Sequence, residues 1–293
     1  MPDAIKYPSI AEVCEKALRL PCSPALLPRL ATALGSDESS GQEIEALISL
    51  DASLAGATLR LANSAALARG KVDSLQEAVL RLGAKEIFRL AALVLVNRWE
   101  SVQALDGRWE PGDFSRQCLI TAIAAEALAE HIGRVSPQAA YSAGLVCDLG
   151  RLAIAHGCAS SYGAIRRHCE ETRGTIETAE RAVLGYHHGD VSARLLKAWN
   201  FPAAFIDLAD YQFRPGEAPA DVVPLLSHVL AARHIGLAMG PGVNADGYLT
   251  AVPGEFLLEW GFTSPILEAA MAATAERAAA RLGEKLTHGA MLV

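Results

Sequence analysis

The sequence lacks most of the short motifs by which enzymes and membrane proteins are recognised. It contains no G-x-S-x-G elbow, no phosphate-binding P-loop, no G-x-G-x-x-G fingerprint and no H-E-x-x-H pair. Its longest apolar run, Leu90 to Val96, is far shorter than the ~20 residues that a transmembrane helix needs. These absences argue against the common hydrolase, nucleotide and zinc-protease sites and against a membrane-spanning chain.

Cysteine is scarce and scattered. The cysteines form no C-x-x-C pair, and the first residues of the chain contain no apolar segment typical of a signal peptide. Thiols spaced in this way are typical of reduced, cytoplasmic proteins, in which cysteine packs as a small hydrophobic residue. We therefore expect a cytoplasmic location and reduced, packed thiols. The six cysteines are Cys14, Cys22, Cys118, Cys147, Cys158 and Cys169.

Aromatic residues and positive charge are also in short supply. Aromatic residues make up 6% of the chain, and the formal net charge is −7. Nucleic-acid-binding proteins present a basic stripe to the phosphate backbone, whereas lysine and arginine are dispersed here among acidic residues. The chain is instead 51% hydrophobic and rich in alanine and leucine, which favour closely packed helices. We expect an all-α protein with no nucleic-acid or membrane partner.

Helix-start signals recur along the first hundred residues. Ser9, Ser40 and Ser74 each precede a glutamate by three residues, which is a capping-box pattern. Asp51 is suited to the N-cap of another helix. Apolar stripes follow these signals, and Gly83 interrupts the last of them. The pattern predicts a bundle of five or six short helices.

A polar segment rich in glycine and proline, Trp99 to Gly112, is the candidate domain boundary. It divides the chain into an N-terminal helical bundle, residues 1–110, and a second helical domain with a C-terminal extension, residues 111–293. A loop is expected over Gly240–Gly254. Amphipathic patterns in the second part predict helices over Phe114–Ile132, from Pro137 to the Cys147-Asp148 junction, from about Arg151, and over Ser160–Glu171, Thr175–Leu184, Asp190–Trp199, Ala203–Tyr211, Asp221–Met239 and Ser264 to about Thr287.

Three blocks of the first part resemble a known family. In their order and spacing they are similar to the HDOD domain, in which an Asp-Pro pair commonly stands where Asp51-Ala52 stands here. The resemblance runs from about Leu20 to about Pro215. It implies an N-terminal helical bundle packed against a C-terminal, degenerate HD-type helical domain. The blocks are Leu47–Leu54, Leu59–Ala65 and Ser74–Gly83.

The resemblance also implies where a catalytic site is expected. HD-type phosphohydrolases hold divalent metal ions with His and Asp side chains, and the metals generate hydroxide and bind the phosphate oxygens. Gly144–Gly150 is similar to their Gly-Leu-Leu-His-Asp-Ile-Gly segment, with Cys147 in place of the histidine before Asp148. Matching by position places the family's site on Gln117, Cys147, Asp148, His188, Gln212 and Phe213.

Most of these positions have lost their metal ligands. Only Asp148 and His188 keep side chains of the family pattern. Gln117 and Gln212 are neutral and weak ligands, and Phe213 cannot coordinate a metal. Because two or three ligands rarely hold a catalytic metal pair, we expect no bound metal, no cofactor and no hydrolysis by the HD mechanism.

Three interpretations of the remaining side chains stay open. A single zinc ion held by Cys147, Asp148 and either His187 or His188 is compatible with their ligand chemistry. Cys147 paired with His188 is a candidate thiol nucleophile. The favoured interpretation is structural: Asp148 caps the following helix, Cys147 fills a core position, and His188 hydrogen-bonds Asp148 or a backbone carbonyl.

The polar Asn63-Ser64 loop has two possible roles. It is a candidate recognition surface, together with Asp51. Asn63 is also suited to a left-handed or capping position that closes its helix, and we favour this structural role.

The resemblance implies a bacterial-type, non-enzymatic signal-transduction protein that binds a signalling protein partner. The cleft between the two halves and the degenerate HD pocket are the candidate surfaces. The competing hypothesis is a divergent metal-dependent phosphohydrolase or phosphodiesterase acting on a nucleotide or cyclic dinucleotide. A third is a sensor that binds a cyclic dinucleotide without cleaving it.

Overall fold

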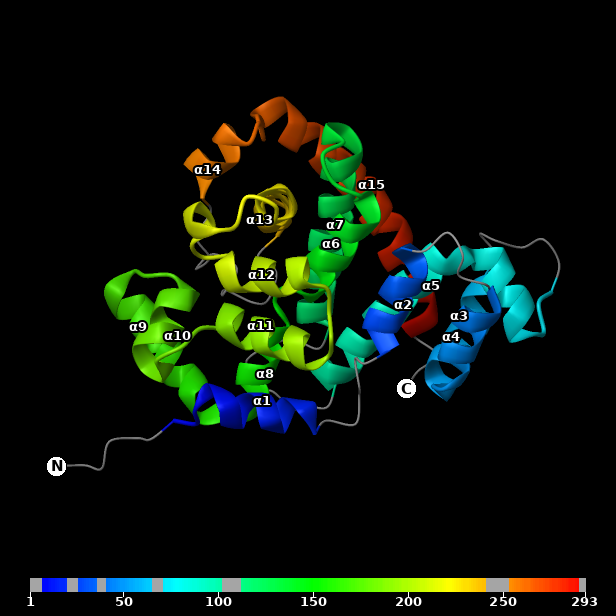
Figure 1. Ribbon diagram of the computed structural model, residues 1–293, viewed down its shortest axis with the longest axis horizontal. Coiled ribbons are helices and arrows are strands. Elements are labelled where there is room, and N and C mark those ends of the chain that lie inside the picture. Colours follow the sequence, from blue (N-terminus) through cyan, green and yellow to red (C-terminus); the bar gives the residue numbers. More distant parts are fainter. Residues whose placement is uncertain are drawn as a thin grey trace.

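The computed structural model describes residues 7–19, 26–35, 41–64, 71–101, 112–240 and 253–289 (Figure 1). These residues form helices joined by turns, with no strand among them, so the all-α prediction is confirmed. The predicted boundary after residue 110, Cys22 and most of the predicted Gly240–Gly254 loop lie outside the described ranges. None of the helices in the described part combines the length and apolar character needed to cross a bilayer.

Three of the N-terminal helices begin at the capping residues expected from the sequence, whereas the expected cap Ser40 lies outside the described residues. Ser9 makes a complete capping box with Glu12, Asp51 accepts hydrogen bonds from two backbone N–H groups, and Ser74 accepts one from Glu77. Helices α2, α3 and α4 pack against α5, which confirms the predicted bundle. The helices are α1 (Ile10–Leu18), α2 (Leu26–Gly35), α3 (Gly41–Ser49), α4 (Ala52–Ala62) and α5 (Leu75–Ser101).

Helix α5 is interrupted at the glycine that the sequence marks as a breaker. Gly83 has φ 74° and ψ 159°, a conformation that residues with a side chain rarely adopt. The two parts of α5 therefore meet at a kink. The part after the kink leads into the second half of the molecule, where α5 contacts α6, α7 and α8.

The second half contains the helices that surround the predicted HD-type site. Helices α9 and α10 form a hairpin at one side of the molecule (Figure 1). Two short 3-10 turns lie at Ala159–Ser161 and Pro215–Glu217. The helices are α6 (Asp113–Ile132), α7 (Pro137–Val146), α8 (Leu149–Gly157), α9 (Tyr162–Thr172), α10 (Ile176–Leu184), α11 (His188–Ala198), α12 (Ala203–Tyr211) and α13 (Val223–Ala238).

Helix α6 is the central helix of this half and packs against α7, α13 and α15. Its alanine-rich surface allows close approach, and a Cβ on Gly144 of α7 would lie 3.1 Å from the Cα of Ala122. The buried carboxylate of Glu100, on α5, accepts hydrogen bonds from the backbone N–H groups of Gly112, Phe114 and Ser115. It thereby satisfies the first turn of α6, whose N–H groups have no partner within the helix.

The C-terminal extension completes the helical core. Helix α15 (Ser264–Gly289) was expected, and it packs along α6. Helix α14 (Gly254–Glu259) was not expected, because its six residues are too few to show a helical stripe in the sequence. The predicted loop ends at Gly254, which is the first residue of α14, so the end of the loop agrees with the structure to within one residue.

Helix α1 packs against the second half of the molecule. It lies under α8 and α11, away from the α2–α5 bundle (Figure 1). A Cβ on Gly157 would lie 3.0 Å from the side chain of Val13, and the hydroxyl of Tyr186 donates to the carbonyl of Pro8 at 2.9 Å. One hydrophobic core extends from Val13 to Ala278 and includes both halves of the chain.

Candidate functional site

The turn at Cys147-Asp148 joins α7 to α8 and sits against the start of α11. A glycine is required here, because a Cβ on Gly150 would lie 2.0 Å from the carbonyl oxygen of His188. The Gly150 N–H instead donates to the Ser192 hydroxyl at 2.8 Å. This close contact places the side chain of Asp148 and the ring of His188 in one buried region, as the family resemblance implies.

The centre of this region is occupied by the guanidinium group of Arg233, on α13. Its Nη2 donates to Oδ1 of Asp148 at 2.8 Å and to Oε1 of Gln212, and lies 4.0 Å from Sγ of Cys147. The Arg233 side chain is only 4% exposed. Asp148 stands at the N-cap position of α8 but makes no capping hydrogen bond, so the prediction that its carboxylate caps α8 is wrong.

Phe213 covers the same cation. The guanidinium carbon of Arg233 lies 5.5 Å from the centre of the Phe213 ring, within the range of a cation–π contact. The rings of His187 and His188 meet the Phe213 ring edge to face, with centroids 5.0 and 4.9 Å away. Phe213 therefore contributes packing and a π surface at a position where no metal ligand remains.

His188 bonds to a carboxylate that sequence reasoning missed. Oε2 of the buried Glu180, on α10, lies 2.6 Å from Nδ1 of His188 and accepts the backbone N–H of the same residue at 2.8 Å. The Nε2 of His188 is 3.9 Å from Oδ1 of Asp148, too long for a hydrogen bond. The expected partner, Asp148 or a backbone carbonyl, is thus corrected to Glu180.

His187 has a local structural role at the start of α11. Its ring accepts the backbone N–H of Asp190 at 3.2 Å, and the Asp190 carboxylate accepts the His187 N–H at 2.9 Å. Burial lowers the pKa of His187 below its usual value, although the charge of Asp190 acts in the opposite direction. A reciprocal cap of this kind fixes the ring and leaves its Nδ1 occupied.

Cys147 is a core residue, as expected. Its thiol is 1% exposed and donates weakly to the carbonyl of Gly144 at 3.6 Å. Burial, and then the negative charge of Asp148, raise the pKa of Cys147 to about 12. In the absence of a metal ion the thiol therefore stays protonated at neutral pH, whereas a thiol nucleophile must be a thiolate.

The side chains gathered here do not fit a catalytic metal ion. One oxygen of Asp148 and the amide oxygen of Gln212 are engaged by Arg233. A second positive charge at the same place would be repelled by the guanidinium group. Within the described ranges, no three His, Cys, Asp or Glu side chains are arranged to hold a metal ion.

The remaining predicted residues lie on α6 and around α4. Gln117 is half-buried on α6. Asp51 precedes α4, and Asn63 and Ser64 follow it; Figure 1 shows α4 at the right of the view, away from α11 and α12. The structure therefore does not bring Asp51, Asn63 and Ser64 together with the HD-type positions.

Asn63 joins the end of α4 to the segment before α5. Its amide donates to the carbonyls of Leu59 and Val72 at 2.9 and 2.7 Å, and its Oδ1 accepts the N–H of Val72 at 2.8 Å. Asn63 is the C-cap of α4, but its φ of −98° is outside the left-handed region. The neighbouring Ser64 has a buried hydroxyl with no hydrogen-bond partner.

Arg233 and Glu180 were absent from the sequence-based site, although a signal for both exists. Arg233 follows Leu226, Val229 and Leu230 on the same helical face, so it is a charge within an apolar stripe. Glu180 is likewise a buried charged residue that follows the buried apolar residues Ile176 and Ala179 on α10. A charged residue at a core position requires a buried partner.

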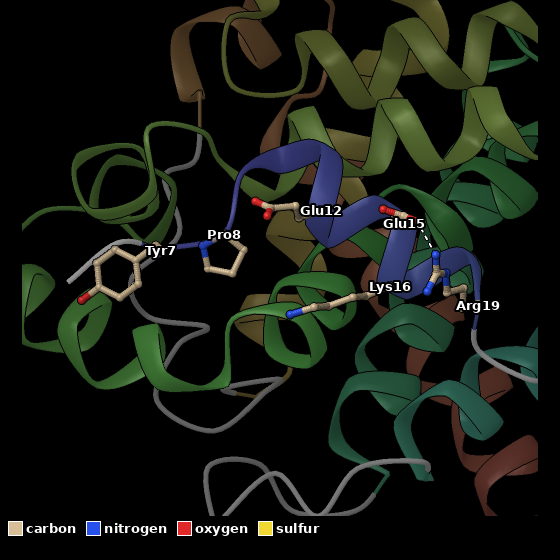
Figure 2. A pocket seen from close by; sticks show the side chains of 6 residues that line it. All are labelled: Tyr7, Pro8, Glu12, Glu15, Lys16 and Arg19. Carbon is tan, nitrogen blue, oxygen red and sulfur yellow. Dashed lines mark hydrogen bonds and ion pairs between the residues drawn. The ribbon is translucent and has the colours of Figure 1, made fainter.

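A surface pocket lies along α1 and does not include any predicted site residue. Figure 2 shows its charged side chains extending from successive turns of the helix. They already have partners: Arg19 pairs with Glu15 at 2.5 Å, and Nζ of Lys16 donates to the carbonyl of Gly157 at 3.2 Å. The lining residues are Tyr7, Pro8, Glu12, Glu15, Lys16 and Arg19.

Comparison with known proteins supports both the fold and the matched segment. A family model described as the HDOD domain matches residues 20–215. None of the curated proteins matches the chain. Among solved structures, an HDOD domain protein of unknown function from Geobacter sulfurreducens has a TM-score of 0.68 and 19% identity, and the match covers 95% of each chain.

Two further solved structures have a similar fold. A candidate phosphohydrolase from Shewanella amazonensis SB2B has a TM-score of 0.61 and 21% identity, with 90% of this chain and 98% of that chain covered. A candidate signal transduction protein from Marinobacter aquaeolei VT8 has a TM-score of 0.61 and 22% identity, with 89% of this chain and 60% of that chain covered. At these identities the similarity is one of fold.

Proposed function

Because the chain belongs to the HDOD domain family, we propose that it is a non-enzymatic signal-transduction protein that acts by binding a partner protein. The proposal keeps the cytoplasmic location expected from the scattered cysteines. The relative from Marinobacter aquaeolei VT8, named as a candidate signal transduction protein, supports the general role. The partner is proposed to be another protein of the same signalling system.

The contacts of Arg233 carry this proposal. Hydrolysis by an HD-type site needs metal ions that generate hydroxide and bind phosphate oxygens. Here the guanidinium group bonds to Asp148 and Gln212, so it competes with a metal ion for both of these oxygens. We infer that the buried Arg233 and Gln212, with the half-buried Phe213, take up the space that a substrate phosphate would need.

The N-terminal bundle offers a better surface for a partner than the filled HD-type region. Leu50 and Leu80 are 72% and 73% exposed. Leu50 follows α3 and precedes the capping residue Asp51, while Leu80 lies on α5 beside the first residue of α3, since a Cβ on Gly41 would be 3.7 Å from its Cδ2. We propose these two leucines, one at each end of α3, as the apolar contacts of the partner.

Metal analysis and hydrolysis assays test the non-enzymatic part. The purified protein, incubated with Mn²⁺, Fe²⁺ or Zn²⁺ and then desalted, is expected to retain no stoichiometric metal. It is expected to hydrolyse cyclic di-GMP and bis(p-nitrophenyl) phosphate no faster than the matched variant Asp148→Ala. Two metal ions per chain, with turnover that Asp148→Ala abolishes, would show instead a divergent phosphohydrolase.

Variants of the bundle surface test the partner-binding part. Proteins that crosslink to the wild-type chain in its own cells are identified by mass spectrometry, and the same capture is repeated with Leu50→Asp and Leu80→Asp. We expect these changes to remove a specific partner, and Leu258→Asp, a 63% exposed leucine on α14, to retain it. Equal capture by all variants contradicts the assigned surface. Calorimetric titration with cyclic di-GMP tests the alternative of a nucleotide sensor, which would bind this ligand without cleaving it.

A further inference from the structure

We propose that Arg233 is a built-in replacement for a metal ion: its guanidinium group supplies, from within the chain, the cation that joins the Cys147-Asp148 turn to the end of α12. This inference is independent of the partner-binding function, because it concerns how the region is held together. It also assigns a role to a side chain that neither the sequence motifs nor the family match single out.

The geometry resembles that of a metal centre in the way it links distant segments. Arg233 is 85 residues from Asp148 and 21 residues from Gln212 in the chain, yet Nη2 contacts both. The same nitrogen lies 4.0 Å from the Cys147 sulfur. A carboxylate, an amide oxygen and a thiol from two segments thus surround one positively charged nitrogen that a third segment carries.

The neutral residues around Arg233 suit a guanidinium group better than a metal. An amide oxygen is a good hydrogen-bond acceptor but a weak metal ligand, and the ring of Phe213 attracts a cation through its π face without donating electrons to a metal. The Cys147 thiol stays protonated and adds no negative charge. The donor set therefore matches a cation with directional N–H groups.

Charge balance makes Asp148 the essential partner. Arg233 is 4% exposed and Asp148 is 13% exposed, so each charge depends on the other for compensation. The positive charge of Arg151, which is 3% exposed on α8, also reaches Arg233 and opposes it. The Nε of Arg233 is buried without a hydrogen-bond partner. A further cation beside Asp148 would meet the charge of Arg233 at close range.

A double-mutant cycle tests the pairing. Arg233→Met and Asp148→Asn each leave one buried charge uncompensated, so each is expected to lower Tm by on the order of 10 °C. The double variant carries neither charge and is expected to lose much less than the sum of the two. Arg214→Met, which breaks exposed ion pairs with Asp210 and Glu217, is the control and is expected to change Tm by about 2 °C or less.

Additive losses would overturn the proposal, because they would show that the two charges do not depend on each other. If Arg233→Met alone does not fold, the double variant decides. A cooperative thermal transition in the double variant supports charge pairing. Failure of both variants to fold shows that the packing of the arginine stem, and not its charge, is what the region needs, and overturns the proposal.

Cation binding to a variant that lacks the guanidinium group tests whether Arg233 takes the place of a separate cation. Arg233→Ala removes the guanidinium group and leaves space beside Asp148, Gln212 and Cys147. Millimolar guanidinium, which restores the N–H donors, is expected to raise the Tm of this variant by several degrees and to leave the wild type unchanged, whereas Zn²⁺ and Co²⁺ are expected to have a smaller effect. The variant Asp148→Ala/Arg233→Ala is expected to lose this response. An unresponsive but folded Arg233→Ala, or a wild type stabilised equally by guanidinium, would overturn the proposal.

Discussion

The carboxylate of Asp51 takes part in two interactions that a substitution can separate. It caps α4 by accepting the N–H groups of Ser53 and Leu54, each at 3.0 Å. It also pairs with Arg98 of α5, whose Nη2 donates to Oδ1 at 2.7 Å. The hydrogen bond from Arg98, followed by the capping bonds, lowers the pKa of Asp51 to about 2.

The lowered pKa gives a pH dependence with a defined sign. Because the folded-state pKa of Asp51 is about 2 and an unfolded aspartate titrates near ~3.9, the carboxylate stabilises the fold above pH ~4. This stabilisation is lost as the pH falls from about 4 toward 2. Asp51→Asn keeps a capping side chain but has no charge to titrate.

We therefore expect the stability difference between the wild type and Asp51→Asn to shrink between pH 7 and pH 3. Asp51→Ala also loses the cap, so it is expected to be less stable than Asp51→Asn by about 1 kcal/mol at both pH values. Urea unfolding followed by circular dichroism measures these differences. A wild-type advantage over Asp51→Asn that is the same at pH 7 and pH 3 would rule out the ion pair as its source.

Residue-level prediction from the sequence worked where the partner is close in the chain. Asp51 is predicted to be a cap because the N–H donors that its carboxylate accepts lie two and three residues away. The ion pair with Arg98, 47 residues later, needs the fold and has no local signal. The same distinction explains why Asp148 was expected to cap α8, while its bond to Arg233 was missed.

At the scale of helices, the contact between α8 and α11 depends on the absence of a side chain at Gly150. We expect Gly150→Ala to destabilise the protein by about 3 kcal/mol or more, because its Cβ would meet the backbone oxygen of His188 at 2.0 Å. Chemical unfolding measures the loss.

The matched control for this substitution is Gly163→Ala. Gly163 is exposed in α9, and a Cβ there would have no atom within 4 Å. Alanine is the better helix former, so this variant is expected to be unchanged or more stable by up to about 1 kcal/mol. A neutral effect of Gly150→Ala would contradict the close approach of α8 and α11.

The start of α6 depends on a carboxylate that belongs to another helix. Glu100→Ala removes the acceptor of the Gly112, Phe114 and Ser115 N–H groups, two of which are in buried residues. Leaving buried donors unpaired is expected to cost about 2 to 3 kcal/mol. Urea unfolding of Glu100→Ala, beside Glu15→Ala as an exposed control expected to change by about 0.5 kcal/mol, tests this.

Helix existence was largely predictable from the sequence because caps and apolar stripes are local. Gly133 marks the end of α6 and Ser136-Pro137 marks the start of α7, as expected. Gly83 interrupts α5. The cap that Glu100 provides for α6 was not predictable, because it comes from the preceding helix across residues 102–111. Short α14 was missed because six residues do not complete two helical turns.

At the scale of the molecule, one buried core connects the two predicted domains. Val13 of α1 and Ala278 of α15 belong to the same hydrophobic cluster, and α1 packs on α8. The sequence resemblance implied two packed halves but did not indicate that the first helix lies on the second half. When two helices far apart in the chain pack together, the apolar pattern of neither helix identifies the other as its partner.

A continuous core predicts cooperative unfolding. We expect a single calorimetric transition for the whole chain, with equal calorimetric and van't Hoff enthalpies, and coincident loss of helicity and tryptophan fluorescence. Trp99 and Trp199, whose rings lie 5.1 Å apart on α5 and next to α11, report on the junction of the two halves. Two separate transitions would instead support independent domains, 1–110 and 111–293.

The covalent attachment of the Arg233 cation has a consequence for the protein's environment. A coordinated ion exchanges with the medium, and its occupancy follows the abundance of that ion, whereas a guanidinium group on α13 is present in every copy from the moment of synthesis. Chelators cannot extract it, and oxidation of iron cannot alter it. The structure around Asp148 therefore does not depend on the concentration of transition metals in the cell.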